Sequence, residues 1–251
     1  MILLGTHRCF IKVPINYPIT NNKEQNYMYN LSLSKLGGQC LIVGGIVSFI
    51  PFFLQVILGG PPPDNENVFS YIANTTIGSG SLGILYAMMT VFGLALVMYG
   101  IFNLNGLLQE KQKDALLSFG TFLFILGQFG GLIAWSIDPA MIIAKDTANI
   151  SNMFISEMSM FFMFGPLGFL GSALVSLVLA NRVFVNPLFM KISAAVFLLI
   201  IPVFVFTVFN LADSSTHNSA STIIPLFASI SIAQIVSFIW QIMVGLRMMK
   251  N

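Results

Sequence analysis

Four side chains in this sequence have the chemistry to bind a small ligand: Gln55, Gln128, Asp138 and Glu157. Each lies within or beside a long apolar stretch, where a polar group costs free energy unless it finds a partner. Glutamine donates and accepts hydrogen bonds, so Gln55 and Gln128 could line a polar cavity for a small neutral molecule. The alternative is that they only join neighbouring helices, at about 1 kcal/mol per hydrogen bond.

The two acids stand where apolar stretches end or begin, so we expect them at the surface of a membrane rather than inside it. Together with Asp213, they could form an acidic mouth that attracts a cation or an amine. The alternative is that all three are ordinary solvated loop residues. Asp138 is followed by Pro139, which predicts that the helix before it stops there.

The sequence offers little for catalysis. Its two histidines lie outside the apolar stretches, and neither of its two cysteines, Cys9 and Cys40, has a CxxC partner. A structural zinc site needs four ligands, so we predict no metal site. No base and nucleophile pair and no cofactor motif is recognisable, so no cofactor is predicted and an intramembrane enzyme is the least favoured function.

The elements that position these residues are predicted from composition. Only 8% of the 251 residues are charged, against about 25% in soluble domains, and 56% are hydrophobic. Stretches of about 20 apolar residues without alternation predict membrane-spanning helices rather than barrel strands. The chain is therefore predicted to be an all-α, polytopic transmembrane bundle with six spans, at residues 36–63, 82–104, 115–137, 158–181, 192–212 and 223–246.

The basic residues predict the orientation of these spans. Ten of the eleven Lys and Arg fall on one side of a six-span topology, and Lys145 is the exception. Because basic loops stay in the cytoplasm, the sequence predicts a multi-pass cell-membrane protein with both termini cytoplasmic. The charges are scattered between apolar stretches, so the lipid bilayer is the expected partner and nucleic acid is not.

Residues 1–35 are predicted to be a cytoplasmic tail, and residues 36–250 the six-span membrane domain. The tail is rich in Asn, Tyr and Pro around positions 14–29 and has no signal-peptide pattern. We expect it to be disordered, or to precede the true translation start at Met28.

Small residues and prolines predict how the spans pack. Gly127 and Gly131 form a GxxxG pattern that lets another helix approach closely, and glycines elsewhere predict that the second, third and fourth spans form the tight centre. Three prolines within spans are expected to kink their helices, either for packing or as hinges at a ligand site: Pro51, Pro166 and Pro202.

Three stretches carry a resemblance to a known family: residues 120–135, the loop 181–187 (NRVFVNP) and the last span, 238–246 (FIWQIMVGL). Together with the span pattern over residues 36–250, they resemble a family of small six-span prokaryotic membrane proteins of unknown function. The resemblance implies the fold but no reaction. In that family an acid often precedes the Trp of the last span, whereas residues 237–239 here are Ser, Phe and Ile.

Two functions fit these observations. The first is a small permease-like or ligand-binding bundle, based on the glycines, the prolines and the glutamines. The second is an accessory or assembly subunit of a larger membrane complex, based on the small-residue faces, with a membrane protein or a second copy as the partner. A polar cavity in the middle of the bundle would favour the first function, and a solid core would favour the second.

Overall fold

The computed structural model describes residues 32–60, 63, 67–145, 150–212 and 220–250, and every regular element in them is an α-helix. The predictions for residues 1–31 and for Asp213 lie outside the described residues. Six helices are long and two are short. They are α1 (Leu33–Gly59), α2 (Val68–Gly78), α3 (Gly80–Lys111), α4 (Ala115–Trp135), α5 (Ile137–Ile143), α6 (Ile150–Asn181), α7 (Pro187–Ala212) and α8 (Ala220–Met249).

The six long helices match the six predicted spans, and each is long and apolar enough to cross a membrane. Large apolar side chains on their outer faces are exposed, among them Phe92 at 60%, Phe122 at 59% and Leu199 at 69%. Helix α1 ends at Gly59, and Gly60 follows it with φ of +65°, the left-handed conformation that commonly closes a helix.

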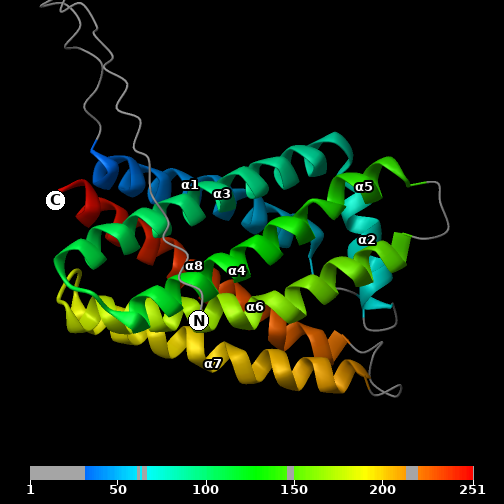
Figure 1. The fold of residues 1–251 in the computed structure, drawn as a ribbon. Helices are drawn as coiled ribbons and strands as arrows, with labels where there is room; N and C mark the ends of the chain where they lie inside the picture. Colours follow the sequence, from blue (N-terminus) through cyan, green and yellow to red (C-terminus); the bar gives the residue numbers. More distant parts are fainter. Residues whose placement is uncertain (1–31, 61–62, 64–66, 146–149, 213–219, 251) are drawn as a thin grey trace, which may run out of the picture. The chain divides into compact units, whose positions relative to one another are not determined.

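The long helices lie lengthwise beside one another (Figure 1), and their contacts close into a ring in chain order. Helix α1 packs on α3, α3 on α4, α4 on α6, α6 on α7, α7 on α8, and α8 returns to α1. The short helices α2 and α5 pack together at one end of the ring, which we call the α2–α5 end. The ring leaves room at its centre, and the short helices cover part of that room at one end.

The closest helix pair, α4 and α6, meets along glycines. A Cβ atom at Gly127 would collide with the backbone of Gly168, and a Cβ at Gly171 would collide with the backbone of Phe124. Gly131 is different, because its nearest neighbour would be a Leu94 side-chain atom at 3.7 Å. The predicted GxxxG face is therefore wrong in its second residue.

The predicted tight centre of the second, third and fourth spans also needs correction. Helices α3 and α4 do touch, but other close seams join α1 to α3 and α1 to α8. In the first, a Cβ at Gly44 would lie 2.7 Å from the carbonyl oxygen of Gly93, and in the second, a Cβ at Gly245 would lie 2.6 Å from the carbonyl oxygen of Gly38. Three glycine seams, α1–α3, α1–α8 and α4–α6, take the place of one tight centre because helix pairing is a tertiary property.

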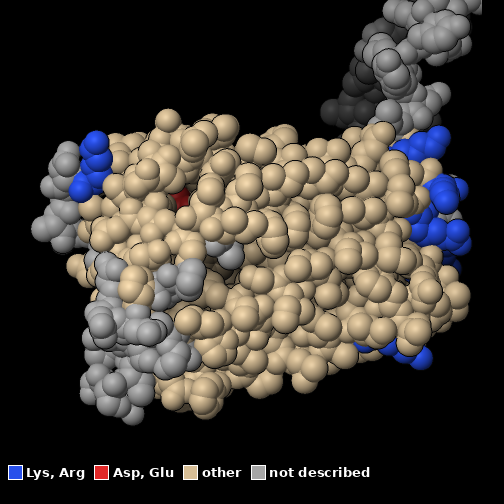
Figure 2. Space-filling view, turned by 180° about the vertical axis from the view of Figure 1, so that it is seen from behind, with Lys and Arg blue, Asp and Glu red and all other residues tan. Residues whose placement is uncertain are grey.

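Seven of the eight Lys and Arg among the described residues lie at the end opposite α2 and α5, which we call the basic end. Figure 2 shows this cluster of basic side chains and, between the two ends, a broad face made of uncharged residues. A small acidic patch is visible through that face, set back from the surface. The distribution is that expected for a membrane protein whose charged residues lie at its two surfaces.

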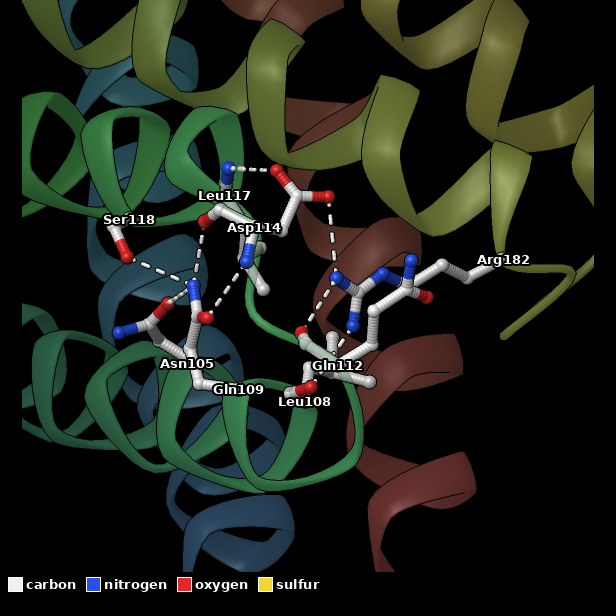
Figure 3. Close-up of polar contacts among 8 residues, drawn as sticks. All are labelled: Asn105, Leu108, Gln109, Gln112, Asp114, Leu117, Ser118 and Arg182. Atoms are coloured by element: carbon white, nitrogen blue, oxygen red, sulfur yellow. Dashed lines mark hydrogen bonds and ion pairs between the residues drawn. The ribbon is translucent and has the colours of Figure 1, made fainter.

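A polar cluster ties two loops together at the basic end (Figure 3). Arg182, just after α6, donates to the carbonyl oxygens of Leu108 at 2.9 Å and Gln112 at 3.0 Å, and to Asp114 Oδ2 at 3.1 Å. Asp114 also accepts a hydrogen bond from the Leu117 backbone at 3.1 Å and so caps α4. One guanidinium therefore fixes the end of α3, the start of α4 and the end of α6.

We expect Asp114→Ala to lower the unfolding free energy by about 0.5–2 kcal/mol, because it removes both the helix cap and the Arg182 partner. Asp114→Asn should cost less, since asparagine also caps helices. The Leu117 N–H, and then Arg182, hold the pKa of Asp114 below its usual value despite partial burial. The carboxylate therefore stabilises the fold above the unfolded pKa of about 4, and this contribution is lost as the pH falls through the lower folded pKa.

Melting temperatures in detergent at pH 7 and at about pH 3 test this prediction. The difference between wild type and Asp114→Asn should be present at pH 7 and shrink in acid. Glu110→Gln, an exposed acid near the end of α3, is the control and should change neither value. A difference that stays constant between the two pH values would contradict the role given to the Asp114 charge.

Candidate ligand cavity

A cavity of about 1060 Å³ lies inside the ring, at the upper limit of the roughly 300–1,000 Å³ typical of small-molecule sites. Its wall includes residues from both short helices and from all six long ones. Leu58 and Leu82 belong to the wall and are 70% and 57% exposed, so the cavity reaches the surface near the end of α1 and the start of α3. That opening lies at the α2–α5 end.

All four residues singled out in the sequence line this cavity: Gln55 from α1, Gln128 from α4, Asp138 from α5 and Glu157 from α6. Gly165 and Gly168 of α6 line it too, beside the helix-interior Pro166. The structure thus brings together side chains that are far apart in the sequence.

Asp138 is buried at 3% exposure, so its interpretation as a solvated loop residue is wrong. Helix α4 ends at Trp135, just before Asp138-Pro139, and after the single residue Ser136 the chain continues as the short helix α5, which contains both residues. Pro139 lies in the first turn of α5, where the missing N–H has no helical partner to lose. Residues Ala115–Ile143 together form one candidate span, and Asp138 belongs to it.

Glu157 is likewise 3% exposed and is not a surface acid. Helix α6 begins at Ile150, so Glu157 lies seven residues inside it, or about 10 Å along its axis. Both acids are therefore buried inside candidate spans, near the ends of those spans, and not at the surface as expected. A carboxyl group can stay within an apolar helix when tertiary contacts give it partners or a polar cavity, which a single sequence does not show.

The acids contact each other. The side chain of Asp138 lies close enough to those of Glu157 and Gln55 to interact with both. Glu157 Oε2 and Gln55 Oε1 have no hydrogen-bond partner. The group therefore has free acceptor atoms in the cavity wall.

A second polar region lies deeper in the cavity, on α8. Gln241 is 7% exposed and donates to Ser237 Oγ of its own helix at 3.1 Å, while its Oε1 has no partner. Gln234, two helical turns earlier, also lines the cavity. Gln241 therefore bonds within its own helix and leaves an acceptor free.

Below these glutamines, the bundle is filled with apolar side chains that we call the floor. Trp240 and Phe124 stack there with ring centroids 6.5 Å apart and are each 2% exposed. They belong to a buried cluster that extends toward the basic end through Leu104, Val244 and Met248. The cavity is therefore open at the α2–α5 end and closed toward the basic end.

Sequence reasoning missed the aromatic part of the wall, which includes Phe52, Trp135 and Phe161. With 24 Phe in the chain, no single aromatic residue stands out. The usable signal was spacing, because each of the three lies three or four residues from Gln55, Asp138 or Glu157, and such residues share a helix face.

Among the described residues, no three His, Cys, Asp or Glu side chains come close enough to hold a metal ion. No family model matches the chain, and no curated protein or solved structure matches it either. The resemblance to the six-span prokaryotic family stays a prediction, and the cavity is the feature from which function is argued.

Proposed function

We propose that this chain is an integral membrane protein that binds a small polar ligand in its central cavity, as a permease-like bundle. The observation that carries the proposal is the cavity itself, with its four polar side chains inside a ring of apolar helices. A subunit that only holds other chains together needs no open polar interior, so the cavity favours ligand binding over an assembly role.

The proposed orientation places the basic end in the cytoplasm, with both termini on that side. It is supported by the concentration of Lys and Arg at that end, since basic loops are retained in the cytoplasm. In this orientation the cavity opens to the outside and the floor closes it to the cytoplasm. This is the arrangement of an outward-open carrier, with Pro166 and its neighbouring glycines as the hinge candidates in the wall.

Thiol labelling tests both parts of the proposal. In a chain with Cys9 and Cys40 replaced by alanine, we expect a membrane-impermeant charged thiol reagent to label Gln128→Cys in intact cells. Phe122→Cys is the matched control on the same helix, because that side chain is exposed on the outer face of the ring. A thiol in hydrocarbon does not ionise, so Phe122→Cys should stay unlabelled.

A third position tests the orientation. Gln112→Cys, between α3 and α4 at the basic end, should react only after the cells are permeabilised. Lack of labelling at position 128 would contradict an open cavity and with it the proposed function. Ready labelling at position 112 in intact cells would reverse the topology.

A further inference from the structure

The polar group of the cavity is one layer of a two-layer structure. On each of three wall segments, a polar and an aromatic residue lie about one helical turn apart, and both line the cavity. The pairs are Gln55 with Phe52 on α1, Asp138 with Trp135 at the α4–α5 junction, and Glu157 with Phe161 on α6.

The order within the three pairs is consistent. Helices α1 and α4 run toward the α2–α5 end, so Phe52 and Trp135 lie deeper than Gln55 and Asp138. Helix α6 runs back toward the basic end, so Phe161 lies deeper than Glu157. An aromatic layer therefore lies about 5 Å below an acid layer, measured along the helices.

The aromatic layer is a packed unit. Trp135 contacts Phe52 edge-on, with ring centroids 6.4 Å apart and ring planes at 86°. It contacts Phe161 in the same way, at 6.0 Å and 83°. Perpendicular rings of this kind present π faces in more than one direction, which is how aromatic cages surround a cation.

The acid layer supplies the charge. Glu157 is almost fully buried, and its Oε2 has no partner. Among the described residues that line the cavity there is no Lys, Arg or His. An ionised carboxyl here has no protein cation to balance it, so the balance comes from a shared proton or from a positively charged ligand.

We propose that this two-layer site binds a small organic ammonium ion, with its charged head against Asp138 and Glu157 and its alkyl groups against the aromatic layer. This inference rests on the proposed function and names its substrate class. The apolar rings disfavour a hydrated metal ion, which requires several oxygen ligands. The acids disfavour an anion, so an alkylammonium is the class that satisfies both layers.

Three probes of nearly the same shape test the charge: choline, its uncharged carbon analogue 3,3-dimethylbutan-1-ol, and the anion 3,3-dimethylbutanoate. Binding is measured by isothermal titration calorimetry on the full chain in lipid nanodiscs. Wild type should bind choline at least about tenfold more tightly than the alcohol, since a buried carboxylate contact and cation–π contacts are lost with the charge. The anion should not bind.

The matched variants are the double substitution Asp138→Asn with Glu157→Gln, and the exposed control Glu110→Gln. Each single cavity substitution leaves one carboxyl group, so the double variant is needed to remove the charge. It keeps the size of both side chains, and its preference for choline over the alcohol should disappear. The ratio between the two probes separates lost recognition from a general loss of folding. Glu110→Gln should keep the wild-type ratio.

No binding of choline by wild type, or an unchanged preference in the double variant, would overturn the inference. Equal competition by sodium or potassium at the same concentration would also overturn it, by showing an inorganic cation site. These failures are distinct from failure of the proposed function, because labelling of Gln128→Cys from outside shows whether the cavity is open whatever its ligand.

Discussion

Gly127→Ala should lower the unfolding free energy by about 1–3 kcal/mol, although it adds a single methyl group. The added Cβ meets the backbone of Gly168 rather than a side chain that could rotate away, so α4 and α6 must move apart. In a membrane, dispersion contacts between closely packed backbones are a main source of helix association. Separating the closest helix pair of the bundle therefore weakens much of what holds it together.

Gly131→Ala is the matched control, one turn further along α4. Its added methyl would lie 3.7 Å from the Leu94 side chain, which is an ordinary contact distance. We expect its melting temperature in detergent to equal that of wild type or to rise slightly, because alanine is a better helix former than glycine. Equal destabilisation by the two variants would show that α4 is rotated relative to the arrangement described here.

The fold could be predicted from the sequence because its main signal is one-dimensional. A spanning helix requires about 20 apolar residues, and the charges that bound such stretches can be counted along the chain. The six predicted spans correspond to α1, α3, α4, α6, α7 and α8 for this reason. The helix pairs could not be predicted in the same way, since Gly127 and Gly131 look equivalent until the position of Gly168 is known.

The site was predicted in part for a similar reason. Gln55, Gln128, Asp138 and Glu157 stood out because polar residues are rare in apolar stretches, and all four line the cavity. Both acids were predicted at the surface but are buried. The prediction failed because Asp138-Pro139 has the local pattern of a helix end and Glu157 was used as a span boundary. Their burial depends on contacts between α1, α5 and α6, which no local pattern encodes.

The two tryptophans of the chain offer a sharper test of where the cavity ends. Trp240 lies in the floor at 2% exposure, packed on Phe124, whereas Trp135 lines the cavity and is half-buried. Trp240→Ala should lower the unfolding free energy by about 3–5 kcal/mol, because it leaves a hole in packed surroundings. Trp135→Ala should cost less, because part of that side chain already faces open space.

The larger effect of Trp240→Ala is expected on access through the bundle. Removing the indole joins the cavity to the space left in the floor and thins the barrier toward the basic end. In inside-out vesicles, Gln128→Cys should resist a charged thiol reagent when Trp240 is present and react when it is alanine.

Trp240→Phe is the volume control, since Nε1 of Trp240 has no hydrogen-bond partner to lose. A phenyl ring should keep position 128 closed from that side. If Trp135→Ala opened this route as fully as Trp240→Ala, the barrier would lie at the aromatic layer instead, and the floor would have no role in closing the cavity.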